Sequence, residues 1–131
     1  MQKINEISIK TSKRIEFLDI TNRIQNTVSN IEQGIIHIYC PHTTAGLTIN
    51  ENADPDVVAD IIRGLERMVP EGAQYDHSEG NSPAHIKASL MGFHQTVLIK
   101  QNKPVLGTWQ AIYFCEFDGP RERKIFITCI S

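Results

Sequence analysis

The chain has 131 residues, of which 40% are hydrophobic and 21% charged, and its formal net charge is −2. This composition is ordinary for one globular domain with a substantial core, and it lacks the basic excess typical of nucleic-acid binding. No apolar run approaches the ~20 residues of a membrane span, and the N-terminus lacks the apolar core of a signal peptide. We therefore expect one domain over residues 1–131, with no nucleic-acid or membrane partner.

The N-terminal half alternates short strand patterns with one helical pattern. Residues 4–10 and 14–18 carry β-like patterns, and apolar residues recur at helical spacing over 20–31. The apolar run 34–40 predicts a buried strand, and the alternating stretch 47–51 predicts its hairpin partner or neighbour.

Two helices are predicted in the middle of the chain. Asp54 followed by Pro55 is typical of a helix start, and Pro70 ends the apolar stripe that follows. Ser82 begins a second, short helix that Gly92 ends.

Three strands, at about 93–99, 105–117 and 124–130, complete the chain. Their connections, KQNKP and DGPRE, are short, which predicts antiparallel pairing of consecutive strands. The expected fold class is α+β, with a largely antiparallel or mixed sheet and two to three packed helices in a single domain.

The cysteines indicate a reducing compartment. Cys40, Cys115 and Cys129 are odd in number, and each lies in an apolar run. We interpret them as reduced core residues and expect a cytoplasmic protein.

The five histidines fall into two groups. His37 and His94 lie in strands, where structural or surface roles are common. His42 follows a strand end, His77 lies in a polar loop and His85 is in the first turn of a helix, positions where a scaffold presents reactive groups. The helix start favours a neutral imidazole at His85, the form that binds a metal or acts as a base. Packing of His85 and solvation of His77 is the alternative interpretation.

Charged residues supply further candidates. Glu51 shares a strand face with apolar neighbours, and Glu116 ends an otherwise apolar strand. A carboxylate in such a place needs a partner or a function. Arg121 and Arg123 follow a tight turn and are suited to phosphate. An edge glutamate and incidental turn charges are the alternatives.

Three strings carry a specific resemblance: HTTAGLTINENADPDVVADI, HSEGNSPAHIKASLMG and LGTWQAIYFCEFDGPRERK. Together they closely resemble the YjbQ-like family, also called the secondary thiamine-phosphate synthase family, over nearly the whole chain. The matching positions are His42, Asn50, Glu51, Asn52, Asp54, His77, Asn81, His85, Gly107, Thr108, Trp109, Gln110, Glu116 and Arg121.

The resemblance implies an α+β fold, a homotrimer and a weak thiamine-phosphate synthase activity. That reaction joins hydroxymethylpyrimidine diphosphate to a thiazole phosphate and releases pyrophosphate. We expect a phosphorylated small-molecule ligand, held by Thr43, Thr44, Asn81, Ser82, Arg121 and Arg123. Glu51 and Glu116 are the catalytic candidates that would orient the ligand or a metal.

A divalent metal is expected at His42, His77 and His85. Three histidines favour zinc or another transition metal, whereas pyrophosphate departure commonly recruits magnesium, which prefers oxygen ligands. Two alternatives stay open: a metal-dependent hydrolase, and a non-catalytic protein that binds a phosphorylated metabolite.

Overall fold

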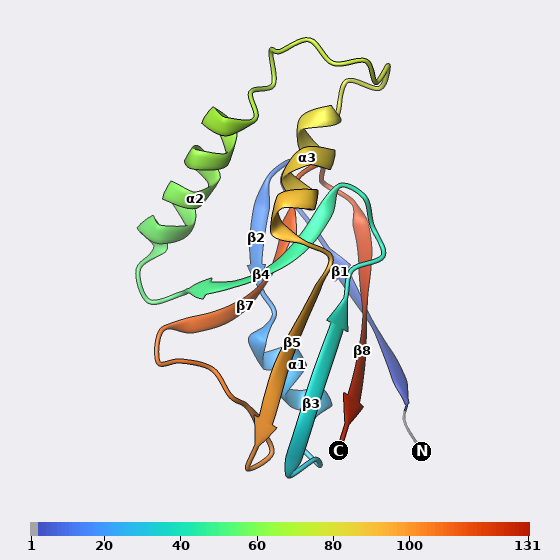
Figure 1. Ribbon diagram of the computed structural model, residues 1–131, viewed down its shortest axis with the longest axis vertical. Helices are drawn as coiled ribbons and strands as arrows, with labels where there is room; N and C mark the ends of the chain where they lie inside the picture. Colours follow the sequence, from blue (N-terminus) through green and yellow to red (C-terminus); the bar gives the residue numbers. More distant parts are fainter. Residues whose placement is uncertain (1–2) are drawn as a thin grey trace.

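The computed structural model describes residues 3–131, in which eight strands form two antiparallel sheets that pack face to face (Figure 1). The strands are β1 (Ile4–Lys10), β2 (Glu16–Asp19), β3 (Gln33–Tyr39), β4 (Ala45–Glu51), β5 (His94–Lys100), β6 (Lys103–Pro104), β7 (Gln110–Glu116) and β8 (Glu122–Ile130). The helices are α1 (Thr21–Thr27), α2 (Pro55–Met68) and α3 (Ser82–Met91). This is the α+β single domain that the sequence predicts.

The larger sheet has the strand order β1-β8-β3-β5-β6, and the smaller sheet has the order β2-β7-β4. Every neighbouring pair is antiparallel. The main core fills the space between the sheets, because alternate residues of each strand point inward. Ile36 and Ile38 of β3 face Leu47 of β4 and Phe114 of β7 in this layer, and all four are fully buried.

A second apolar layer lies on the outer face of the smaller sheet, where α2 and α3 pack. The alternation along β7 explains it: Ile112 and Phe114 point into the main core, whereas Tyr113 and Cys115 lie under the helices. Helix α2 begins as predicted, since Asp54 Oδ1 accepts a hydrogen bond from the Asp56 amide at 2.9 Å.

The outer face of the larger sheet carries exposed apolar side chains. Ile4, Tyr39, Leu98 and Ile130 are 70%, 48%, 59% and 53% exposed, respectively. The helices that cover the smaller sheet do not reach this face (Figure 1). Exposed apolar side chains that gather on one face are typical of association surfaces.

The predicted pairing of consecutive strands is wrong at two places. β3 and β4 belong to different sheets, as do β7 and β8. A short connection can cross between two stacked sheets as well as turn within one sheet, because the sheets lie only ~10 Å apart. The predicted strand 105–117 also starts too early, since β7 begins at Gln110. A separate short strand, Lys103–Pro104, lies just before the predicted range and pairs with β5.

No helix among residues 3–131 is both long and apolar enough to cross a membrane. All three cysteines are free thiols.

Candidate functional site

Segments from four parts of the chain meet around one open, polar cavity of about 370 Å³. They are the β3–β4 connection, the α2–α3 loop, the start of α3, and the β7–β8 connection with the first residues of β8. Its lining residues are Pro41, His42, Thr43, Thr44, His77, Glu79, Asn81, His85, Arg121 and Arg123. The volume suits a small ligand.

His42 is held by backbone rather than by another site residue. Its Nε2 lies 3.0 Å from the amide nitrogen of Lys124 and 3.1 Å from the Lys124 carbonyl oxygen. Burial lowers the pKa of His42, and the positive charge of Arg123 lowers it further. His42 is therefore neutral at physiological pH.

His77 and His85 are in edge-to-face contact, with ring centroids 5.3 Å apart. His77 Nε2 also lies 3.9 Å from Glu79 Oε1. Within residues 3–131, however, no three His, Cys, Asp or Glu side chains are spaced to hold a metal ion. As placed, the three histidines do not form a ligand set, so the transition-metal site stays a prediction.

Thr44 and Arg123 belong to a buried polar network under the cavity. The Arg123 guanidinium donates to both carboxylate oxygens of Glu116, at 2.8 and 2.5 Å, and Nη2 donates to Thr44 Oγ1 at 2.9 Å. Thr11 Oγ1 donates to Glu116 Oε1 at 2.8 Å. Burial raises the pKa of Glu116, but the hydrogen bonds from Arg123, Asp118 and Thr11 outweigh it and hold this pKa below its usual value.

Glu116 is fully buried and does not line the cavity. The amides of Phe117 and Asp118 donate to its Oε2, each at 3.1 Å, so both oxygens are occupied. This carboxylate, predicted as catalytic, positions Arg123 in the structure. A Cβ on Gly119 would lie 2.8 Å from Glu116 Cγ and from Thr11 Oγ1, so the turn needs glycine to approach this network.

Arg121 and Thr43 differ from this network because they are exposed, and Asn81 is partly buried beside them. Arg121 is half exposed and donates from Nη2 to Asp118 Oδ2 at 3.0 Å. Asn81 Nδ2 donates to the same carboxylate oxygen at 3.0 Å. Thr43 is exposed at the mouth of the cavity.

Two predicted site residues lie outside the cavity lining. Glu51 is at the far end of β4 from Thr44, which directly precedes the strand, and the seven residues of the strand span roughly 24 Å at ~3.4 Å per residue. Ser82 is the first residue of α3, and Asn81 rather than Ser82 is the N-cap. Within one chain, Glu51 therefore does not share a ligand with the histidines.

The sequence did not point to Thr11 or Asp118. Thr11 reaches Glu116 across 105 positions of sequence, and no local pattern signals such a pairing. Asp118 is the first residue of the DGPRE connection, and its spacing of three residues from Arg121 was the available signal.

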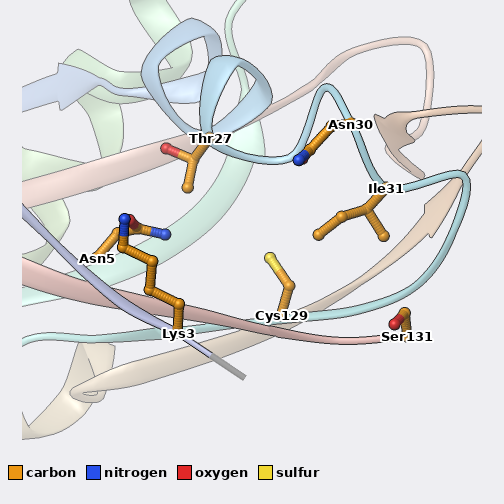
Figure 2. Close-up of a pocket in the computed structure, with 7 residues that line it drawn as sticks. All are labelled: Lys3, Asn5, Thr27, Asn30, Ile31, Cys129 and Ser131. Carbon is orange, nitrogen blue, oxygen red and sulfur yellow. The ribbon is translucent and has the colours of Figure 1, made fainter. Parts of the chain in front are cut away.

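Figure 2 shows a second cavity, of about 460 Å³, between the ends of β1 and β8 and the segment after α1. Lys3, Asn5, Thr27, Asn30, Ile31, Cys129 and Ser131 line it. Burial raises the pKa of the Cys129 thiol, which disfavours the reactive thiolate. The lining of this cavity contains no histidine and no arginine. We therefore place the candidate site at the first cavity, lined by His42, His77 and His85, and call it the histidine cavity.

Comparison with known proteins gives one consistent result. A family profile described as UPF0047 protein YjbQ-like matches residues 5–131. A UPF0047 protein of Methanocaldococcus jannaschii is 55% identical over 125 residues, covering 94% of this chain and 91% of the relative. UPF0047 protein YugU of Bacillus subtilis is 49% identical over 127 residues, covering 95% and 96%.

Solved structures agree with the fold. An uncharacterized conserved YjbQ/UPF0047 family protein from Clostridium acetobutylicum has a TM-score of 0.93 at 55% identity, covering 96% of this chain and 99% of that chain. A YbjQ-like protein of unknown function from Sulfolobus solfataricus has a TM-score of 0.93 at 29% identity, covering 98% and 96%. On the profile match and these identities, the chain belongs to the UPF0047, YjbQ-like family.

Proposed function

We propose that the histidine cavity binds a phosphorylated small molecule and that the protein is an enzyme acting on it. The observation that carries this proposal is the meeting of three histidines, Arg121 and Thr43 at one cavity from separate parts of the chain. Polar side chains that converge on a small cavity are typical of ligand sites.

Arg121 is the main cation for an anionic ligand. Its guanidinium is half exposed and uses Nε and Nη2 on Asp118, which leaves Nη1 free of any partner in the described chain. Arg123, by contrast, has its charge balanced by Glu116 at 2.5 Å. Thr43 adds a hydroxyl at the mouth of the cavity. We therefore assign phosphate contact to Arg121 and Thr43, and a supporting role to Arg123 and Thr44.

The reaction we propose is the one that the family resemblance implies. A thiazole nitrogen attacks the pyrimidine methylene carbon, a C–N bond forms, and the C–O bond breaks as pyrophosphate leaves with the electron pair. Arg121 would stabilise the charge that develops on pyrophosphate. His85, half-buried beside His77, would donate a hydrogen bond from its ring N–H to the departing oxygen. No step is assigned to a metal, because the histidines as placed do not form a ligand set.

A non-catalytic metabolite-binding protein is the second candidate. The favouring observation is that Glu79, an exposed loop residue, is the only carboxylate among the cavity-lining residues, while Glu51 and Glu116 lie elsewhere. A site that contacts an anion but lacks a buried carboxylate to act as a base would bind the ligand without turnover.

Titration calorimetry with inorganic pyrophosphate tests the binding step. Arg121→Gln should weaken affinity by at least tenfold, as expected for the loss of a charge-assisted contact. Arg63→Gln is the matched control, since Arg63 is also an exposed arginine paired with an aspartate three residues away. If both variants bind like the unchanged protein, or if pyrophosphate does not bind, the proposed site is wrong.

Turnover is tested separately, with the pyrimidine diphosphate and the thiazole phosphate supplied together. Product formation that His85→Gln reduces at least tenfold would support the enzyme, and binding without product would favour the non-catalytic candidate. Thr43→Val should raise the KM, and Thr27→Val, in the cavity of Figure 2, is its control.

We also propose a homotrimer in the cytoplasm. The exposed apolar face formed by Ile4, Tyr39, Leu98 and Ile130 supports self-association. Three free cysteines support a reducing compartment.

A further inference from the structure

One buried polar atom in the site has no hydrogen-bond partner. The side-chain oxygen of Asn81, Oδ1, is closed to solvent and is the only such unpaired side-chain atom among the described residues. Asn81 lines the histidine cavity. A buried acceptor without a donor costs free energy, so its presence at a candidate site needs an explanation.

The orientation of the Asn81 amide is fixed by its neighbours. Nδ2 donates to Asp118 Oδ2 at 3.0 Å, and that carboxylate also accepts from Arg121 Nη2 at 3.0 Å. A flipped amide would place its oxygen against the carboxylate oxygen, where no proton is available. Asp118 therefore fixes which atom of the amide is the oxygen, and Oδ1 can act only as an acceptor.

Helix capping does not use this oxygen. Asn81 is the N-cap of α3, yet its side chain makes no capping hydrogen bond. Pro83 has no amide hydrogen, and the amides of Ala84 and His85 bond to the Asn81 backbone carbonyl at 3.0 and 3.4 Å. The first turn of α3 thus leaves Oδ1 unused.

We infer that Asn81 makes the site selective for an oxyanion that still carries a proton. This inference rests on the proposed function, because it assumes that an anion enters the cavity. Oδ1 accepts only from a donor, so it matches the hydroxyl of hydrogen phosphate or hydrogen pyrophosphate. Sulfate has the same tetrahedral shape, and at about pH 8 the same main charge, but it carries no proton, and its oxygen would oppose Oδ1.

Entry of the ligand requires a local movement, since Oδ1 is closed to solvent. His77 shares the cavity wall and is exposed, and its polar contact within the described chain is the 3.9 Å approach to Glu79. Rotation of such a side chain is fast and inexpensive. On this proposal, the movement that admits the ligand is a side-chain rotation in the cavity wall.

The experiment compares inorganic phosphate with sodium sulfate by titration calorimetry at about pH 8, where both ions are mainly dianions. The unchanged protein should bind phosphate at least tenfold more tightly than sulfate, the factor that one hydrogen bond to a buried acceptor supplies. Asn81→Leu should reduce this ratio to below about threefold, and Asn81→Ala serves if the leucine variant does not fold. Asn30→Leu, in the cavity of Figure 2, should leave the ratio unchanged.

Each outcome decides the question. Equal binding of the two ions by the unchanged protein overturns the selectivity but leaves the proposed anion site standing. A ratio that persists in the Asn81 variants assigns the selectivity to another residue and also overturns the inference. If neither ion binds, the proposed function fails, and this inference fails with it.

Discussion

Arg123 and Glu116 form a two-pronged ion pair beneath the candidate cavity, with Nε–Oε1 and Nη2–Oε2 separations of 2.8 and 2.5 Å. The pair joins β7 of the smaller sheet to β8 of the larger one, so it ties the two sheets together at the cavity floor. Both side chains are buried, and the polar contacts between them are therefore shielded from water.

Removing one member of this pair should destabilise the fold strongly. Arg123→Met leaves the Glu116 carboxylate buried without its cation, and we expect a loss of about 3–5 kcal/mol in the free energy of unfolding. Arg121→Met is the control: its pair with Asp118 is half exposed, so its loss should cost under ~1 kcal/mol. Urea denaturation measures both, and equal effects would contradict the assignment of Arg123 to the core.

The same pair predicts how stability responds to acid. Burial raises the pKa of Glu116, but the contacts from Arg123, Asp118 and Thr11 bring it below the usual value. The folded state therefore binds the proton less tightly than the unfolded state. The stabilisation is present above the unfolded glutamate pKa of about 4.3 and is lost as the pH falls below it toward the folded pKa.

Glu116→Gln removes this titrating group. The variant should be less stable at neutral pH, and its free energy of unfolding should fall less steeply between about pH 5 and pH 3. Denaturation curves at several pH values measure the slope. Parallel slopes for the two proteins would show that other carboxylates control the acid response.

The sequence predicted local features of the fold well and pairing between distant segments poorly. The start of α2 follows from Asp54 and Pro55, adjacent residues whose effect is local. The placing of β3 and β4 in different sheets depends on contacts with β5, β7 and β8, far along the chain. No turn residue between two strands records which sheet the second strand joins.

In the candidate site, too, the sequence predicted local features but not those that depend on distant contacts. His42 follows a strand, His77 lies in a polar loop and His85 is at a helix start, which are local signals. The structure places all three at one cavity. The burial of Glu116 beneath Arg123 depends on packing of the two sheets, which periodicity does not reveal. The remoteness of Glu51 follows from its position at the other end of β4.

Helix α2 offers a stability test that is independent of the site. Asp54 is the N-cap of this helix, and its side chain accepts a hydrogen bond from the Asp56 amide at 2.9 Å. Asp54→Ala should lower the free energy of unfolding by about 1 kcal/mol, because this hydrogen bond is lost. Asp60→Ala is the control within the same helix, because its exposed ion pair with Arg63 contributes little. Thermal melts should separate the two variants, and ligand binding should be normal in both.

The exposed face of the larger sheet predicts self-association. Leu98 of β5 is 59% exposed on this face, and Leu98→Lys should convert the expected trimer to a monomer at micromolar concentration. Leu90→Lys is the matched control, since Leu90 is 52% exposed but lies on α3. Sedimentation velocity reports the oligomeric state. A trimer that both variants retain would place the interface on another surface.

Metal removal distinguishes an anion site without a metal from a zinc site at the three histidines. If Arg121, Thr43 and Asn81 hold the anion, dialysis against EDTA should change phosphate affinity by less than about twofold, an energy difference smaller than one hydrogen bond. The zinc site predicted from His42, His77 and His85 is tested by adding Zn²⁺ to the same sample. Zinc ligation through His42 Nε2 would break its 3.0 Å contact with the Lys124 amide.

The Lys124 amide resonance in NMR spectra is therefore the specific reporter, and it should shift at one equivalent of Zn²⁺. The shift should disappear in His77→Ala and His85→Ala, which lack the other two ligands. His37→Ala is the control, because His37 bonds to Thr96 on the outer face of the larger sheet, away from the cavity. If the Lys124 amide resonance does not respond to zinc and the protein still binds phosphate, the cavity is an anion site without a metal.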